Sequence, residues 1–319
     1  MIAVVDTDEG LHALVPAWEA LWRGRPEATP FQSPAWLLPW WRQFGTGMPR
    51  VATLRRAGAL QAVLPMYVLD EPGVRKLLPI GAGTTDYLDA LGGPAAPLLH
   101  AVLERARADG VDQCDLIEVP PGSALLTAAW PGGWQAAWSA GSPCPVLALP
   151  GIPAGIRRKV RMNRNRAERG GGWTTEVATA ATLGPLQAEL IRLHQARWTV
   201  RGEEGSLASP AVLGFHRQAA PALLAAGVLR LQALRIGGGV AAAIMALLAG
   251  DRILFYLSGF DEAHAFVSPG TILLGAMLDE AMREGRTEAH FLRGRESYKY
   301  AWGGVDRMNM ACRLTQLRS

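Results

Sequence analysis

An internal repeat constrains the fold of this chain more than any other feature of its sequence. The segment LLGAMLDEAMREG at 273–285 aligns without gaps with LLHAVLERARADG at 98–110. Two more pairs match in the same order, SPAWLLPWWRQ with SPAVLGFHRQ and LRRAGALQAVL with LRIGGGVAAAI, and the three shifts are 175, 176 and 180 residues. The sequence therefore predicts a tandem duplication into domains 1–150 and 151–319, which meet at the breakers of LPGIPAG.

Each half has the same expected order of elements: helices, strands joined by hairpins, an amphipathic helix and a further strand. Apolar periodicity predicts the early helices at 11–24, 33–45, 155–170, 183–198 and 209–227. The β-like segments of the second half are 228–236, 239–250 and 251–260, with a glycine turn at 237–239. Gly110 and Gly285 suit the ends of the two amphipathic helices. This order predicts an α/β fold, made twice, in which a mixed and mainly antiparallel sheet is flanked by helices.

Composition excludes several classes of protein. The chain is 49% hydrophobic, so each half can bury a core. Its longest apolar run, GVAAAIMALLAG, has 12 residues, which favours a buried strand because a membrane helix needs ~20. The N-terminus has no basic region typical of a secretory signal. Three scattered cysteines without a CxxC pair favour a reduced, cytoplasmic protein with neither disulfides nor a metal site.

One basic segment carries the positive charge of the chain. The net charge is +4, yet residues 157–169 alone hold seven basic residues and one acidic residue. This run could bind RNA phosphates, an acidic polysaccharide or a coenzyme phosphate. It could equally be a solvated helix that packs only on Ile156, Val160 and Met162. The cations at mixed helical spacings are Arg157, Arg158, Lys159, Arg161, Arg164 and Arg166.

Six segments together resemble the GNAT acyltransferase superfamily. They are SPAWLLPWWRQFG (33–45), TTDYLDAL (84–91), KVRMNRNRAER (159–169), LHQARW (193–198), SGFD to SPGTILL (258–274) and FLRGRESYKYAWGG (291–304). The set is most similar to the tandem-GNAT acetyltransferases associated with cellulose biosynthesis, which are related to the FemABX peptidyltransferases. The resemblance implies two GNAT-like domains, with an acyl-CoA such as acetyl-CoA bound in the C-terminal one and an amine or hydroxyl as acceptor.

The segment SPGT at 268–271 is the expected donor site. The first N–H groups of a helix lack internal partners and its dipole is positive there, so the start of a helix suits a pyrophosphate. An ordinary serine or threonine cap followed by a helix is the alternative. The GNAT signature of glutamine or arginine with spaced glycines is absent, and the first half has GPAA (93–96) in this place, so that half is not expected to bind the donor. The candidate donor-binding residues are Ser258, Gly259, Ser268, Pro269, Gly270 and Thr271.

The stretch RGRESYKYAWGG at 293–304 is the candidate catalytic segment. Lys299 could stabilise a phosphate or a developing oxyanion, and Tyr298 or Tyr300 could protonate a leaving thiolate. Glu296 could take a proton from the acceptor. The Tyr-Lys pair followed by an aromatic residue and glycine resembles the Fem-type pattern. The alternative is a solvated surface cluster with a core tryptophan, made of Arg293, Arg295, Glu296, Lys299 and Trp302.

His290 lies on a predicted strand, where relatives tend to have aspartate. Histidine can act as a base near neutral pH, or it can be structural. Carboxylates beside a cleft could hold a cationic acceptor, although Asp and Tyr in such a loop also stabilise turns. The candidate acceptor-binding residues are Asp86, Tyr87, Asp89 and Arg293. The tryptophans expected in the core rather than in a sugar platform are Trp36, Trp40 and Trp41.

Two classes of function follow from these patterns. The first is an acyl-CoA-dependent N- or O-acyltransferase acting on a small-molecule or polysaccharide-related acceptor by direct attack on the thioester. The second is a non-catalytic RNA- or polysaccharide-binding protein that uses the basic helix at 157–169. A Fem-like transferase that takes its acyl group from aminoacyl-tRNA would need both features.

Overall fold

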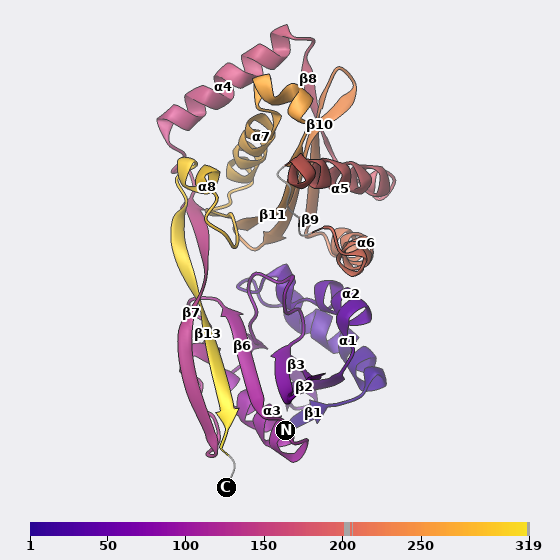
Figure 1. Ribbon diagram of the computed structural model, residues 1–319, viewed down its shortest axis with the longest axis vertical. Coiled ribbons are helices and arrows are strands. Elements are labelled where there is room, and N and C mark those ends of the chain that lie inside the picture. The colour runs from indigo at the N-terminus through magenta and orange to yellow at the C-terminus, as the bar shows by residue number, and fades with distance from the viewer. Residues whose placement is uncertain (201–204, 206, 318–319) are drawn as a thin grey trace. The chain divides into compact units, whose positions relative to one another are not determined.

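The computed structural model describes residues 1–200, 205 and 207–317, and their path is drawn in Figure 1. The chain forms two compact units. The first contains Met1–Pro143 together with Arg307–Ser319, and the second contains Cys144–Asp306. The expected division at residue 150 put the whole C-terminal segment in the second domain, whereas here its last strand groups with the first unit.

The first unit is built on a mixed sheet. Its strands β1 to β4 pair antiparallel in sequence order, and β6 returns parallel to β4 after the helix α3. The strands are β1 (Ile2–Val5), β2 (Met48–Arg56), β3 (Ala59–Glu71), β4 (Val74–Pro79), β5 (Leu91–Gly92) and β6 (Gln113–Val119). The helices are α1 (Asp8–Arg23), α2 (Pro34–Phe44) and α3 (Ala95–Ala108), with the 3-10 turns η1 (Pro30–Gln32) and η2 (Ala124–Thr127).

The second unit repeats this order. Its antiparallel strands are followed by the helix α7, after which β12 runs parallel to β11. The strands are β8 (Trp173–Val177), β9 (Leu229–Ile236), β10 (Gly239–Ala249), β11 (Arg252–Phe260) and β12 (Glu288–His290). The helices are α4 (Ala154–Arg169), α5 (Leu183–Val200), α6 (Pro210–Ala225), α7 (Pro269–Arg283) and α8 (Ser297–Ala301), with the 3-10 turn η3 (Glu262–Val267).

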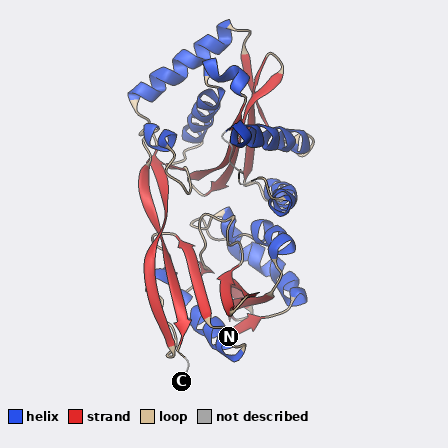
Figure 2. Ribbon diagram, in the orientation of Figure 1, coloured by secondary structure: helices blue, strands red, loops and turns tan. Residues whose placement is uncertain are grey.

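Two long strands belong to both units. The strand β7 (Trp134–Ala148) begins in the first unit, and its last residues pair antiparallel with β12 of the second. The strand β13 (Val305–Gln316) begins in the second unit and lies between β6 and β7 in the strand order. The last strand of each repeat thus pairs with a strand of the other repeat. For this reason the boundary between the two units differs from the boundary predicted at residue 150. Figure 2 shows both strands in red.

The sheet of the second unit is covered on both faces. Alternate residues of β10, including Ala242, Ile244 and Ala246, pack with the α7 residues Ile272 and Met277 in one buried cluster. Because successive strand residues point to opposite faces, the intervening β10 residues face the other layer. That layer contains α5, which contacts β9, β10 and β11. One face of β11 therefore packs toward α7 and the other toward α5.

Most of the predicted elements are present. The glycine turn has φ of 56° at Gly237 and 83° at Gly238, and Gly110 and Gly285 follow their helices with φ of 70° and 77°. The strands β1 and β8 were not predicted, and the segment 297–301 is a short helix. The last strand before it is only three residues long, because the chain turns at Leu292, where φ is 58°.

Other expectations concern burial. The tryptophans predicted in the core are 0–5% exposed, namely Trp36, Trp40 and Trp41. The three cysteines are buried and carry free thiols. None of the helices in the described part of the chain combines the length and hydropathy that crossing a membrane requires.

Candidate functional site

The parallel strands β11 and β12 separate after the third of the nine residues of β11. They pair at only three positions, from Arg252 with Glu288 to Leu254 with His290. Beyond that point β11 continues to Phe260, with β10 on one edge and, among the described strands, none on the other. The outward N–H and C=O groups of an edge strand can in general bind an extended ligand.

A β-bulge lies directly after the point of separation. Met245 of β10 is opposite Leu257, whereas Ala246 is opposite Phe255, so Tyr256 is an extra residue on β11. A bulge exchanges the faces of all later residues. As a result Phe260 packs with the α7 cluster and Gly259 faces α5.

Gly259 is required by the packing of α5. A Cβ atom on this residue would lie 2.6 Å from the backbone N of His194 and 2.7 Å from Cβ of Leu193. Gly259 was among the candidate donor-binding residues. The structure shows that the approaching group on this face is the helix α5 itself.

The open edge of β11 includes the backbone of Ser258. Asp261 N donates to Ala241 O of β10 at 2.8 Å, and in antiparallel pairs every second residue bonds to the same neighbour. The N–H and C=O of Ser258 therefore point away from β10. Nδ1 of His194 lies 3.0 Å from this carbonyl oxygen, and since a carbonyl only accepts, Nδ1 carries the proton of this bond.

A second histidine lies near the first. His216 of α6 is 3% exposed, and its ring centroid is 5.5 Å from that of Tyr256. Burial and the neighbouring His194 lower the pKa of His216 to about 4, so it stays neutral at physiological pH. No role was predicted for either histidine, because each occupies an ordinary position in an amphipathic helix and only the sheet brings the two helices together.

Strand β11 leads through η3 to the start of α7, which coincides with the predicted SPGT site. Ser268 has a left-handed backbone, with φ of 51° and ψ of 66°, and its side chain makes no capping hydrogen bond. Its carbonyl instead accepts from the N–H groups of Thr271 and Ile272. The nearest atom to a Cβ built on Gly270 is 3.6 Å away, on Phe260. The alternative of an ordinary serine cap is therefore wrong, and a Cβ atom on Gly270 would make only ordinary contacts.

Lys299 has a different environment from the one expected of an exposed catalytic cation. Its side chain is 3% exposed, and Nζ lies 2.9 Å from Oε2 of Glu296. The same ammonium donates to the backbone carbonyls of Leu292, Arg293 and Gly294 at 3.1, 2.6 and 3.3 Å. Lys299 thus holds together the loop that follows β12, and the interpretation of a solvated cluster does not fit this residue.

Trp302 is 4% exposed and belongs to the α7 core, as the alternative interpretation required. Tyr298 is 38% exposed, and its ring packs edge-on against Phe291. Tyr300 donates from its hydroxyl to Asp306 at 2.8 Å. Desolvation and this bond raise the pKa of Tyr300, so its hydroxyl keeps its proton more firmly than an isolated tyrosine.

His290 is buried at the end of β12. Its Nε2 lies 3.0 Å from Oε2 of Glu288, which is on the same face of the strand. It pairs with Leu254 of β11, just before the strands separate. The Glu288 carboxylate orients the His290 ring, as the carboxylate of a catalytic triad orients its histidine.

The acceptor candidates divide between the units. Arg293 lies in the second unit, where it is half-buried. In the first unit the Asp86 carbonyl accepts from Asn309, and the Tyr87 ring packs edge-on near Phe31. Asp89 accepts from the Ser123 hydroxyl at 2.5 Å and from the N–H of Ala90 at 2.8 Å. These hydrogen bonds hold the loop together, as the alternative interpretation of a turn-stabilising set predicted.

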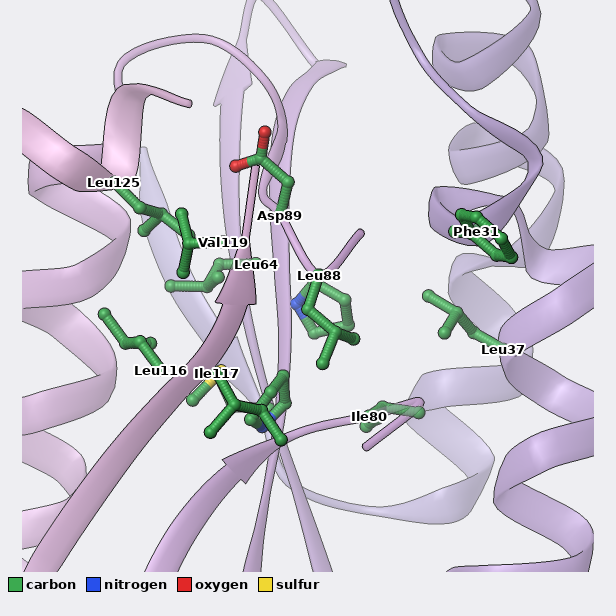
Figure 3. A pocket seen from close by; sticks show the side chains of 13 residues that line it. Phe31, Leu37, Leu64, Ile80, Leu88, Asp89, Leu116, Ile117, Val119 and Leu125 are labelled. Atoms are coloured by element: carbon green, nitrogen blue, oxygen red, sulfur yellow. The ribbon is translucent and has the colours of Figure 1, made fainter. Parts of the chain in front are cut away.

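Apolar side chains fill the corresponding gap of the first unit. There β4 and β6 pair at only two positions and then separate. Figure 3 shows the apolar side chains around this gap, with the Asp89 carboxylate among them. They leave a cavity of about 10 Å³, barely enough for one water molecule. The residues that fill it include Leu37, Leu64, Ile80, Leu88, Ile117 and Leu125.

Asp89 supplies a test of this packing. Burial raises the pKa of Asp89 from 3.8 to about 6, although Ser123 and Ala90 act against the shift. The folded state therefore binds the proton more tightly than the unfolded state, so this group costs stability as pH rises from ~4 to ~6. We expect Asp89→Asn to gain up to about 3 kcal/mol relative to the wild type across this range, since one pKa unit corresponds to about 1.4 kcal/mol. Urea unfolding at pH 4.5 and 7.5 measures the difference, and a gain independent of pH would contradict it.

The basic helix α4 has a buried and an exposed face. Val160, Asn163 and Ala167 are buried, whereas Met162 is 48% exposed. The expected packing through Met162 is therefore wrong. Arg164 bonds to Asp279 and lies over the Trp173 ring. The basic residues of α4 for which the described part of the chain provides no side-chain hydrogen bond or ion pair are Arg158, Lys159 and Arg161.

Part of the chain matches a protein family model. Residues 154–300 match the model described as "Acetyltransferase (GNAT) domain". The match lies wholly within the second unit. A comparison with curated protein sequences found no match.

Solved structures show the fold at low sequence identity. The structure of FemX has a TM-score of 0.65 and 12% identity, with 93% of this chain and 95% of that one covered. The C-terminal domain of a putative lysylphosphatidylglycerol synthetase from Agrobacterium fabrum has a TM-score of 0.60 and 13% identity, with 94% and 91% covered. A tandem GNAT protein from the clavulanic acid biosynthesis pathway has a TM-score of 0.50 and 14% identity, with 100% and 99% covered. The expected fold of two tandem GNAT-like domains is therefore confirmed.

Proposed function

We propose that this chain is an acyltransferase that takes an acyl group from an acyl-CoA, acetyl-CoA in the first instance, and transfers it to an amine or hydroxyl. The observation that carries the proposal is the open edge of β11. It begins beside the bulge at Tyr256 and leads to the start of α7. The GNAT family match over residues 154–300 supports this assignment.

The geometry fits a long donor with a charged end. The peptide-like arm of coenzyme A can bond to the edge groups of β11, as an added strand does. Its pyrophosphate suits the positive dipole and the Gly270 N–H at the start of α7, since the N–H groups of Thr271 and Ile272 already bond to the Ser268 carbonyl. The thioester then lies toward the bulge. The filled gap of the first unit supports the proposal that only the second unit binds the donor.

The residues predicted to be catalytic take revised roles in this proposal. Lys299 and Glu296 position the loop 292–296 rather than act on the substrate, because the ammonium already contacts three carbonyls. Tyr298 is the tyrosine proposed to protonate the leaving thiolate, since the Tyr300 hydroxyl bonds to Asp306. His290, held by Glu288, remains a candidate base. The acceptor is proposed to be a small molecule or a polysaccharide precursor.

A second candidate is a Fem-like transferase that uses aminoacyl-tRNA as donor. The exposed cations of α4 favour it, because Arg158, Lys159 and Arg161 lie on one helix and could contact successive phosphates. The fold is equally compatible with this donor, given the likeness to FemX. The start of α7 distinguishes the two, since a coenzyme pyrophosphate needs it and a tRNA held by α4 does not.

The decisive experiment places a negative charge at the start of α7. Gly270→Asp keeps the helix stable, because acidic residues are favourable in the first turn and the side chain has space. The carboxylate would nevertheless repel a pyrophosphate. Bonds to a charged ligand contribute about 1.5–3 kcal/mol each, so we expect acetyl-CoA affinity to fall about 100-fold by calorimetry.

The neutral variant Gly270→Asn is the matched control, and we expect its affinity to stay within about tenfold of the wild type. If wild-type protein does not bind acetyl-CoA at millimolar concentration, the proposal fails. Transfer from bulk aminoacyl-tRNA by the same preparation would then establish the second candidate. Equal affinities of the two variants would remove the α7 site from the proposal.

A further inference from the structure

We propose that the α4 surface is a docking site for a lipid bilayer that contains acidic phospholipids. The α4 surface is the outward side of this helix together with the neighbouring turn η3, and its residues are Arg158, Lys159, Arg161, Met162 and Phe266. Figure 1 shows α4 along the outside of the second unit, with α7 on its inner side. The proposal concerns a second site on the molecule and does not depend on the proposed function.

The helix α4 buries one side and exposes the other. Val160 and Ala167 are buried and lie two turns apart, which places them on the same side of the helix. Both pack in the α7 cluster. Arg158, Arg161 and Met162 are exposed, and their spacing makes them neighbours on the opposite side. Because the apolar side of α4 is already packed within the second unit, a partner can contact only the exposed side.

The cations of the α4 surface are available to a partner. Among the described residues, none forms a hydrogen bond or ion pair with the side chains of Arg158, Lys159 and Arg161. Arg164, by contrast, bonds to Asp279 at 2.9 Å. The helix contains seven basic residues and one acidic residue, so its own carboxylate cannot neutralise the patch. The charge of the α4 surface is therefore complementary to a negatively charged partner.

Two exposed apolar side chains border these cations. Nη1 of Arg166 donates to the Phe266 carbonyl at 2.6 Å, which places η3 against α4. Met162 lies one turn before Arg166 on the same side of the helix. Met162 is 48% exposed and Phe266 is 61% exposed. Phe266 is the only exposed phenylalanine in the described part of the chain, so its position beside a basic patch calls for an explanation.

A bilayer uses both kinds of side chain at once. Each lysine or arginine beside an acidic membrane surface raises affinity about fivefold. Apolar side chains next to them enter the region below the head groups and leave water. An RNA backbone would also attract the cations, with a similar dependence on salt, but it offers no apolar region for Met162. The pairing of cations with exposed apolar side chains therefore favours a bilayer over a polyanion.

The test measures cosedimentation of the full chain with lipid vesicles. One set of vesicles is pure phosphatidylcholine, and the other contains about 30% phosphatidylserine, which gives the surface a negative potential. The cation variant combines Arg158→Ala, Lys159→Ala and Arg161→Ala. Its control removes the same number of positive charges from exposed arginines elsewhere in the chain, by the substitutions R42A, R56A and R217A.

A second variant separates a bilayer from RNA. Met162→Gln combined with Phe266→Gln keeps every charge of the α4 surface and removes its apolar side chains. The matched control is Ile2→Gln combined with Met48→Gln, because these side chains are 42% and 39% exposed in the first unit. All of these positions are exposed, so the substitutions leave the buried cores intact.

We expect the wild type to bind the acidic vesicles and to bind pure phosphatidylcholine at least about 30-fold more weakly. The cation variant should lose about 100-fold in affinity for the acidic vesicles, because three contributions of about fivefold multiply. The apolar variant should lose at least about tenfold, since burial of two apolar side chains is removed. Both controls should stay within about threefold of the wild type, because surface charges far from the contact are screened.

The proposal is overturned if the wild type does not sediment with the acidic vesicles at millimolar lipid, or if the cation variant binds them as its control does. Bulk tRNA is the competing partner and is tested with the same proteins. If the apolar variant sediments with the acidic vesicles as the wild type does, while the cation variant alone loses tRNA, the α4 surface binds RNA and the proposal is wrong. None of these measurements needs an acyl donor, so they are independent of acetyl-CoA binding.

Discussion

Replacing Lys299 with methionine is expected to lower the free energy of unfolding by about 3 kcal/mol. Removing one partner of a buried ion pair costs about 3–5 kcal/mol, and the lower end applies because the other partner, Glu296, is 54% exposed and can rehydrate. The loss also leaves the carbonyls of Leu292, Arg293 and Gly294 without their donor. Left-handed Leu292, with φ of 58°, would lose the contact that holds it.

Glu296→Gln is the matched control for this prediction. It removes the exposed partner and leaves the ammonium with its carbonyls, so its cost should stay below about 1 kcal/mol. Urea unfolding measures both variants. A catalytic lysine predicts the reverse of the structural role, namely unchanged stability with lost thiol release. Stability of Lys299→Met within 1 kcal/mol of the wild type would therefore restore the original interpretation.

Replacing Gly259 with valine should destabilise the second unit by about 3 kcal/mol or more. The new Cβ would lie 2.6 Å from the backbone N of His194 and 2.8 Å from the backbone C of Leu193. Neither is the end of a flexible side chain, so the whole of α5 would have to move away from β11. Overpacking of this kind costs about 1–3 kcal/mol, and more where backbone is involved.

Gly239→Val is the matched control because Gly239 also lies on a strand of this sheet. The nearest atom to a Cβ there is the Ile236 carbonyl oxygen, at 3.8 Å, and valine favours strands. Its unfolding free energy should stay within about 1 kcal/mol of the wild type. If Gly259→Val were equally harmless, then α5 would not rest on β11 as described, and the position of His194 would lose its basis.

The candidate site was only partly predictable from the sequence. The start of α7 at Ser268 was found because a Ser-Pro-Gly-Thr segment before an apolar periodic stretch is a local signal. Lys299 was noticed for its chemistry, but its role was not predicted, since its partners are carbonyls of a loop that carries no side-chain signal. His194 and His216 lie in the quoted segments LHQARW and SPAVLGFHRQ, but no role was predicted for either, because each lies on its own helix and neither is near the other in sequence.

The sequence by itself determined the order of most elements, although it missed the strands β1 and β8 and the short helix at 297–301. Helical periodicity, serine and proline at helix starts, and glycine at turns act within a few residues, so they can be read along the chain. The repeat of two similar halves followed from the same local patterns. Such features can be predicted because each depends on residues that are neighbours in sequence.

Only the tertiary structure decided which strands pair beyond the hairpins and which face each side chain takes. The insertion of β13 between β6 and β7 depends on backbone hydrogen bonds between segments far apart in the chain, and these bonds have no side-chain signature. The extra residue at Tyr256 turns Gly259 toward α5 and so brings His194 to Ser258. A strict alternation read from the sequence would have put these residues on the wrong faces, because a bulge arises from the pairing partner and not from the strand alone.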